Sequence, residues 1–175
     1  AGGKQMFSNL TRVREAFPEK HLIFTEGTTA SFREEGYQTW EYGEKYGRSM
    51  INDFNRGTVG WPDWNILLDQ RGGPNHVGNF CMAPVHADLE TGELIYTPSY
   101  YYIGHFSKFI RPGAKRVSTA PSRSHLLATS FMNEDGTIVT VVMNQSDQEI
   151  QYRLVIGGYQ SVLIILPHAI QTLIY

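Results

Sequence analysis

Hydrophobic residues in the first part of the chain follow two patterns, one with helical spacing and one with continuous apolar runs. Residues 5–17 carry apolar side chains at intervals of three and four, which predicts an amphipathic helix that ends before Pro18. Residues 21–26 form a run of strand length that closes with Glu26 and then turns small and polar. A run bounded in this way is typical of a buried strand in a parallel sheet. Helix followed by buried strand indicates an α/β arrangement.

The alternation continues with a second helix, a second strand and a third helix. Residues 39–55 place aromatic and apolar side chains on one stripe, together with two glycines that lower the helix propensity. Residues 58–68 predict a strand that is bulged or ends near Trp61, because Pro62 cannot donate a hydrogen bond to a ladder. The remaining segments are a loop at 69–79, a hairpin at 85–96 and a helix at 98–110. This order matches the closing quarter of a (β/α)₈ barrel, strands seven and eight with their flanking helices.

Beyond residue 113 the chain changes to short apolar stretches separated by turn signals. The stretches are 126–132, 137–143, 150–156, 161–166 and 170–175. They predict an antiparallel β-sandwich, and no functional residue is assigned to it. We therefore expect two domains, residues 1–113 as the carboxyl-terminal part of a barrel and residues 114–175 as an incomplete sandwich. Two triplets of the glycosylation type, at Asn9 and Asn144, are frequent by chance and receive little weight.

Composition and charge argue against several functional classes. The formal net charge of −2 gives no electrostatic reason to expect nucleic acid or an anionic membrane as a partner. The single cysteine, Cys81, rules out an internal disulfide framework and a cysteine-rich metal site. The histidines show no spacing typical of metal ligands, so we expect no metal and no organic cofactor. No apolar run approaches the roughly 18 residues that a membrane helix needs.

Glu26 is the first candidate for catalysis because it closes a predicted buried strand. The carboxyl ends of parallel strands form the edge where α/β folds place their active sites. A solvated glutamate at a strand end is the plainer interpretation of this residue alone. All three tryptophans, Trp40, Trp61 and Trp64, follow within a window of 25 residues. They predict either one shared aromatic core or a surface that stacks on the flat apolar face of a ligand.

Four motifs follow one another in order along nearly the whole chain. They are Thr25-Glu26-Gly27, Gly60-Trp61-Pro62-Asp63-Trp64-Asn65, Gly72-Gly73-Pro74-Asn75 with Asn79-Phe80, and Gly104-His105-Phe106-Ser107-Lys108-Phe109-Ile110-Arg111-Pro112-Gly113. One such motif alone is a weak signal, whereas four in sequence with sensible gaps are specific. Together they resemble glycoside hydrolase family 30, and the resemblance is closest to its glucosylceramidase (acid β-glucosidase) branch.

The resemblance implies a retaining β-glycosidase on a (β/α)₈ barrel with an attached β-sandwich. In that family the nucleophile is a glutamate at the end of the seventh barrel strand, and Glu26 matches it. Trp64 and Asn79 match the residues that line the sugar-binding subsite, whereas Asp63 and Asn65 are expected to support the pocket wall. The resemblance therefore implies that Glu26, Trp64 and Asn79 share a sugar-sized cleft, with a β-linked glycoside as the substrate.

The second carboxylate that a retaining glycosidase needs has no counterpart here. In the family it belongs to an Asn-Glu pair after the fourth strand, and the only such pair here, Asn133-Glu134, lies in a predicted sandwich turn. We expect a longer enzyme whose amino-terminal part supplies this acid/base. The present chain by itself is then expected to be inactive and prone to self-association. The resemblance implies a secreted, periplasmic or lysosomal enzyme, and the sequence does not choose among these compartments.

Two alternatives stay open at this point. Within the enzyme class, a relative that cuts β-1,6-glucan or xylan fits the same motifs, since substrate choice depends largely on barrel loops outside this sequence. Outside that class, a non-catalytic carbohydrate-binding module would use the sandwich and the tryptophans to bind glycan. The α/β segment and a strand-end glutamate have no purpose in such a module, which favours the enzyme.

Overall fold

The computed structural model describes residues 4–175, with side chains from Phe7 onward. The chain divides into two compact units, the first ending at Gly104 and the second beginning at His105. This division falls within a helix, and the domain boundary after residue 113 remains a prediction. No helix in the described part of the chain is both long and apolar enough to cross a lipid bilayer.

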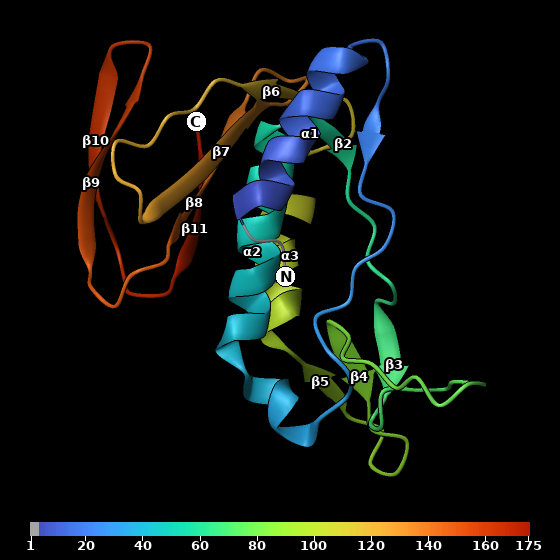
Figure 1. The fold of residues 1–175 in the computed structure, drawn as a ribbon. Helices are drawn as coiled ribbons and strands as arrows, with labels where there is room; N and C mark the ends of the chain where they lie inside the picture. The colour runs from blue at the N-terminus through green and yellow to red at the C-terminus, as the bar shows by residue number, and fades with distance from the viewer. Residues whose placement is uncertain (1–3) are drawn as a thin grey trace. The chain divides into compact units, whose positions relative to one another are not determined.

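The first unit combines helices with short parallel strand pairs (Figure 1). Its helices are α1 (Lys4–Ala16), the 3₁₀ helix η1 (Glu34–Gln38), α2 (Trp40–Asn55) and α3 (Pro98–Ser107), the last of which continues past the end of the unit. Its strands are β1 (Leu22–Ile23), β2 (Thr58–Gly60), β3 (Leu67–Asp69), β4 (Val85–Ala87) and β5 (Leu94–Tyr96). β1 pairs in parallel with β2, and β3 pairs in parallel with β4, which pairs antiparallel with β5.

Helix α2 is the centre of this unit because one of its faces is buried along its whole length. Tyr46, Met50 and Ile51 are buried at helical spacing, as the apolar stripe predicts. Gly43 lies on the same face, where an added Cβ would come within 2.4 Å of the Tyr102 ring of α3. The helix ends just before Gly57, whose φ of +96° few other residues adopt.

Two predicted strands are shorter than the hydrophobic pattern indicates. The predicted strand at 21–26 pairs only at Leu22–Ile23, so Glu26 lies three residues past the strand end. The strand predicted within 58–68 ends at Gly60, which confirms the predicted end near Trp61, and the remaining residues form no part of it, because β3 begins only at Leu67. Pro62 accounts for the break, since it removes a ladder donor.

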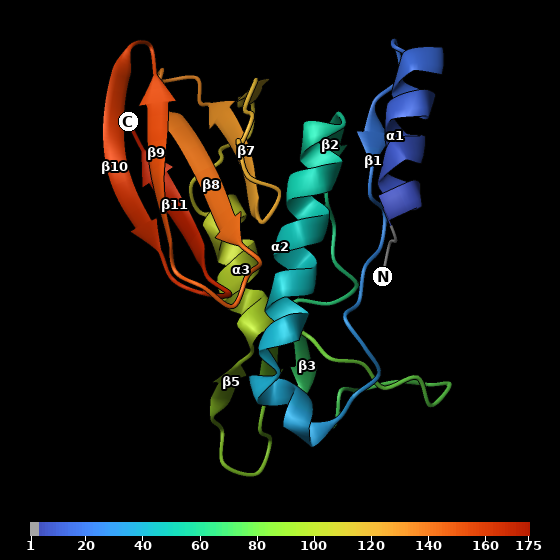
Figure 2. The same ribbon diagram turned by 60° about the vertical axis from the view of Figure 1, so that its left-hand side comes forward.

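The second unit is antiparallel throughout its named strands. These are β6 (Lys115–Val117), β7 (Leu126–Met132), β8 (Ile138–Asn144), β9 (Ile150–Ile156), β10 (Tyr159–Ile165) and β11 (Ile170–Ile174). One sheet has the order β11-β8-β7-β6, and β9 and β10 form a separate hairpin beside it (Figure 2). Their facing side chains share one apolar core, which includes Leu126, Ala128, Val142, Ile150 and Ile165. An α/β part followed by an antiparallel part confirms the predicted fold class.

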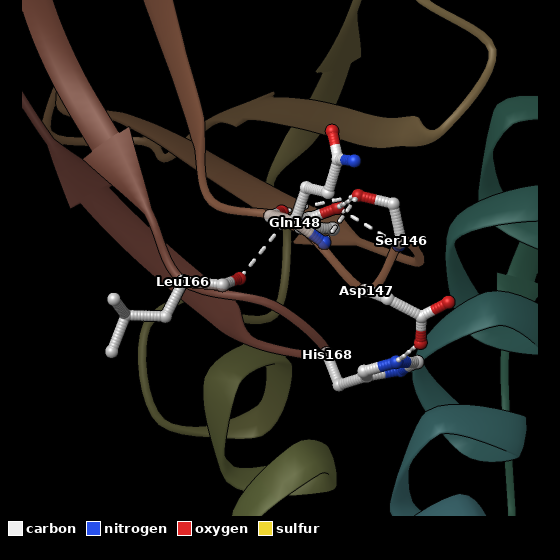
Figure 3. A network of polar contacts seen from close by, with 6 residues as sticks. Ser146, Asp147, Gln148, Leu166 and His168 are labelled. Carbon is white, nitrogen blue, oxygen red and sulfur yellow. Dashed lines mark hydrogen bonds and ion pairs between the residues drawn. The ribbon is translucent and has the colours of Figure 1, made fainter.

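Asn144 is buried and closes the turn between β8 and β9. Its amide nitrogen donates to the carbonyl oxygens of Gln148 and Leu166 at 2.7 and 2.9 Å, and its Oδ1 accepts from Ser146. In the same network, His168 Nε2 lies 2.7 Å from Asp147 Oδ1 (Figure 3). The Asn144 side chain is fully buried and its amide group is occupied by these hydrogen bonds, so it is not accessible for glycosylation. The Asn144 triplet is therefore a structural feature.

Candidate active site

The segment that follows β1 runs beside the segment that follows β2. The Phe24 amide donates to the Gly60 carbonyl at 3.0 Å, and the Trp64 amide donates to the Gly27 carbonyl at 2.8 Å. Gly27 directly follows Glu26, so the backbone of the predicted sugar-stacking residue is hydrogen-bonded to the residue next to the predicted nucleophile. Sequence spacing alone cannot reveal this contact, because the two residues are far apart in the chain.

Glu26 and Trp64 both have exposed side chains in this chain, with 48% of the Trp64 surface accessible. Among the described residues, none forms a hydrogen bond or an ion pair with the Glu26 carboxylate. An uncommitted carboxylate and an exposed indole, on segments joined through the Gly27 carbonyl, are a charged group and an apolar face that a ligand could use. This pairing suits a sugar, which presents hydroxyls at its rim and C–H bonds on its faces.

Trp61 has a different environment from Trp64, although only two residues separate them. Its ring stacks on Phe24 with centroids 4.4 Å apart and planes 9° apart. Its Nε1 donates to Asp53 Oδ2 of α2 at 2.8 Å, and burial raises the pKa of that carboxyl. Trp61 is therefore a half-buried structural residue, whereas Trp40 and Trp64 are exposed, so the tryptophan cluster of the sequence does not form one surface.

Asp63 anchors the same segment to α2. Its Oδ1 accepts from the hydroxyl of Tyr46 at 2.6 Å, and burial raises the pKa of the Asp63 carboxyl, against the hydrogen bonds from Tyr46 and the Trp64 amide. Asn65, the other predicted wall residue, is half-buried. Tyr46 was not identified from the sequence, where it was part of the apolar stripe of a helix. The sequence did hold a signal for this contact, because a tyrosine on the buried face of a helix needs a hydrogen-bond partner for its hydroxyl.

Asn79 lies on a loop built by its neighbours. The Asn75 side chain accepts from the amides of Val77 and Asn79 and donates to the Asn79 carbonyl, which makes it the turn residue. Two backbone hydrogen bonds attach this loop to the chain that follows Glu26. The Phe32 amide donates to the Phe80 carbonyl, and the Met82 amide donates to the Ala30 carbonyl. No hydrogen bond of the described residues links the Asn79 side chain to Glu26 or to Trp64.

A cavity of about 300 Å³ adjoins the Glu26 segment. Gly27, Tyr46, Asp53 and Trp61 are among its lining residues, but Glu26, Trp64 and Asn79 are not. The cleft shared by the three predicted residues therefore stays a prediction. No group of three or more histidine, cysteine, aspartate or glutamate side chains in the described part of the chain is arranged to hold a metal ion.

Fold and site together define a class of protein. A parallel strand pair flanked by helices leads to an antiparallel sandwich, and an uncommitted glutamate follows the first strand of the pair, on a segment hydrogen-bonded to the one that carries an exposed tryptophan. Barrels of this kind carry their catalytic residues just beyond the strand ends, and glycosidases use carboxylates there. These features are those of a glycoside hydrolase.

Comparison with known proteins identifies the family. Residues 4–110 match the Glycosyl hydrolase family 30 TIM-barrel domain, and residues 113–173 match the Glycosyl hydrolase family 30 beta sandwich domain. The chain belongs to glycoside hydrolase family 30, which confirms the resemblance that the four motifs indicate.

Individual relatives agree with this assignment. Lysosomal acid glucosylceramidase of Mus musculus is 35% identical over 147 residues, which make up 82% of this chain and 28% of the mouse protein. SrfJ from Salmonella typhimurium superposes with a TM-score of 0.92 at 34% identity, over 97% of this chain and 38% of SrfJ. An endo-β-1,6-glucanase, with a TM-score of 0.82 at 24% identity over 98% of this chain and 38% of its own, shares the fold. The chain spans less than a third of the length of the mouse protein.

Proposed function

We propose that this chain supplies the nucleophile and part of the sugar-binding subsite of a retaining β-glycosidase that hydrolyses β-glucosides. The observation that carries the proposal is the hydrogen bond of 2.8 Å between the Trp64 amide and the Gly27 carbonyl. It brings the stacking residue to the backbone next to Glu26, whose carboxylate has no other task among the described residues.

The reaction is a double displacement. The Glu26 carboxylate attacks the anomeric carbon as the glycosidic bond breaks, which gives a glycosyl ester on the enzyme. A second carboxylic acid, outside this chain, protonates the leaving oxygen and then takes a proton from the water that cleaves the ester. Trp64 packs on the C–H face of the sugar, and Asn79 exchanges hydrogen bonds with a ring hydroxyl.

The substrate class follows from the relatives, and a glucosylceramide-like β-glucoside is the first candidate. The mouse relative carries the name glucosylceramidase, at an identity that makes a shared site chemistry reasonable. A β-1,6-glucan is the second candidate, because a protein of that activity shares the fold. Assays of the full-length protein on both substrates separate the two.

The test of the role of Glu26 is a Glu26→Ala substitution in the full-length enzyme. Loss of the nucleophile lowers hydrolysis of an aryl β-glucoside by about 10³-fold or more, since a removed catalytic nucleophile costs several kcal/mol. Added azide then restores turnover and yields the α-glucosyl azide, because the anion attacks from the face that the carboxylate has vacated.

The matched control is Glu19→Ala, which removes an exposed glutamate close to β1 that forms an ion pair with Lys20 at 3.8 Å. This variant keeps the activity of the unmodified enzyme. A Glu26→Ala enzyme that retains its rate, or that gives the β-glucosyl azide, assigns the nucleophile to another residue.

A further inference from the structure

The Tyr46 side chain connects helix α2 to the segment that carries Trp64. Tyr46 is 4% exposed, and its hydroxyl donates to Asp63 Oδ1 at 2.6 Å. Its ring meets the edge of Trp61 with centroids 5.3 Å apart. Burial and, to a smaller extent, the negative charge of Asp63 raise the pKa of the Tyr46 hydroxyl, so this group stays a proton donor at any working pH.

The path from Tyr46 to the nucleophile is short and consists of named contacts. Asp63 is joined to Trp64 by a peptide bond, and the Trp64 amide donates to the Gly27 carbonyl. Gly27 is in turn joined to Glu26. A displacement of the Asp63 side chain therefore changes the backbone that sets the Trp64 indole relative to the Glu26 carboxylate.

Helix α2 holds this segment at two points. In one link the helix residue Asp53 accepts a hydrogen bond from Trp61, and in the other the helix residue Tyr46 donates a hydrogen bond to Asp63. Positions seven residues apart lie on the same face of a helix, two turns from each other. The Asp53 link fixes the start of the segment, whereas the Tyr46 link fixes the end that carries Trp64.

We propose that Tyr46 is a positioning residue for the glycosidase reaction, and that it acts through Asp63 on the placement of Trp64 beside Glu26. It does not touch the sugar. The inference rests on the proposed function, since without a nucleophile at Glu26 there is no reaction geometry to position.

The experiment uses Tyr46→Phe in the full-length enzyme, which removes one oxygen atom and keeps the ring. The kcat per active site for an aryl β-glucoside falls by about tenfold with little change in KM, because small errors in alignment act on the transition state. Active sites are counted by titration with a slow glycosyl-transferring inhibitor, so unfolded protein does not lower the measured kcat. A structural role alone would lower the number of active sites and leave their kcat unchanged.

The matched control is Tyr152→Phe in β9, which removes a hydroxyl that donates to Gln171 Oε1 at 2.9 Å in the second unit. This variant keeps the kcat of the unmodified enzyme. A loss of kcat in both variants, or in neither, overturns the inference.

A double-mutant cycle tests whether Tyr46 acts through Asp63. With Asp63→Ala in place, Tyr46→Phe causes no further loss of kcat, because the acceptor is already gone. Asp63→Asn keeps an oxygen acceptor for the hydroxyl and loses less activity than Asp63→Ala. Additive losses of kcat in the cycle contradict the proposed path.

Failure of the function and failure of this inference give different results. If the unmodified enzyme forms no covalent intermediate at Glu26, the proposed function is wrong and the positioning role is overturned with it. If that intermediate forms at the same rate in the unmodified and Tyr46→Phe enzymes, the function stands and only the positioning role is wrong.

Discussion

His86 of β4 has no exposed surface, yet both of its ring nitrogens have hydrogen-bond partners. Nε2 lies 2.9 Å from the Ala83 amide, which can only donate, and Nδ1 lies 2.7 Å from the Asp69 carbonyl, which can only accept. The ring is therefore neutral with its proton on Nδ1. Burial lowers the pKa of His86 below its ordinary value of 6.5, so the native state resists protonation.

Because native His86 is buried and neutral, we predict that the protein loses stability in mild acid. Below about pH 6.5 the unfolded chain binds a proton that native His86 does not bind, so the free energy of unfolding falls as the pH is lowered, by at most about 1.4 kcal/mol per pH unit, until native His86 also titrates. Unfolding of the full-length protein by urea, between about pH 7 and pH 5.5, measures this slope.

The control is His86→Gln, which can keep both hydrogen bonds but does not titrate in this range. In this variant the free energy of unfolding depends less steeply on pH than in the unmodified protein, and the difference is the contribution of His86. Other groups contribute equally to both proteins and cancel, among them His105, whose pKa burial also lowers. Identical slopes in the two proteins would remove His86 from this account.

Single residues show where sequence reasoning reaches its limit. The position of Glu26 just after a strand follows from hydrophobic pattern alone, and its role comes from the resemblance; the predicted burial of that strand is wrong for this chain, since Ile23 is 56% exposed. The different environments of Trp61 and Trp64 do not follow from the sequence, because contact partners decide them: Asp53 and Phe24 hold Trp61, whereas Trp64 stays 48% exposed. Tyr46 was hidden for the same reason, as an apolar stripe reports burial and not hydrogen bonding.

At the scale of elements, the sequence predicts burial better than pairing. Helix α2 and the strands β7 and β8 have nearly the expected bounds, because amphipathic spacing and β-branched runs are local signals. The pairing of β1 with β2 extends over only a few residues. Its extent does not follow from local sequence, because it depends on a partner segment distant in sequence. The helix η1 also escaped prediction, as a short 3₁₀ turn leaves little periodic pattern.

The loop between β3 and β4 depends on Gly72. This residue has a φ of +78°, and an added Cβ would come within 2.4 Å of the Cys81 carbonyl oxygen. Gly72→Ala is therefore expected to lower stability by about 2–4 kcal/mol, the sum of left-handed strain and an overpacked contact with backbone. It is also expected to raise KM, because the Gly72 carbonyl accepts from Cys81 on the loop that carries Asn79.

Gly78 on the same loop separates the two causes. Its φ of +74° is nearly the same, but an added Cβ would meet nothing within 4 Å. Gly78→Ala should therefore cost only the backbone term, about 1 kcal/mol. Thermal unfolding of both variants compares them, and equal losses would show that the contact with Cys81 has no weight.

At the scale of the whole molecule, the proposed function assigns one part of a glycosidase site to this chain. A retaining mechanism needs two carboxylates about 5 to 5.5 Å apart. We propose Glu26 as one of them, and the resemblance implies that the other comes from a part of the enzyme that precedes this chain. Asn133-Glu134, the only Asn-Glu pair of the sequence, lies at the end of β7, where Asn133 joins two turns of the second unit through Phe109 and Thr137. The sequence predicts neither the substrate nor the acid/base, because the resemblance assigns both to barrel segments that have no counterpart among these residues.

The central claim, that Glu26 is the nucleophile, is tested most directly by trapping the covalent intermediate. The full-length protein is treated with a 2-deoxy-2-fluoro-β-glucosyl fluoride, digested and mapped by mass spectrometry. The account predicts one added fluoroglucosyl group on the peptide that carries Glu26, and none after Glu26→Gln. A label on another carboxylate, or steady hydrolysis of β-glucosides with no label on any peptide, would contradict it.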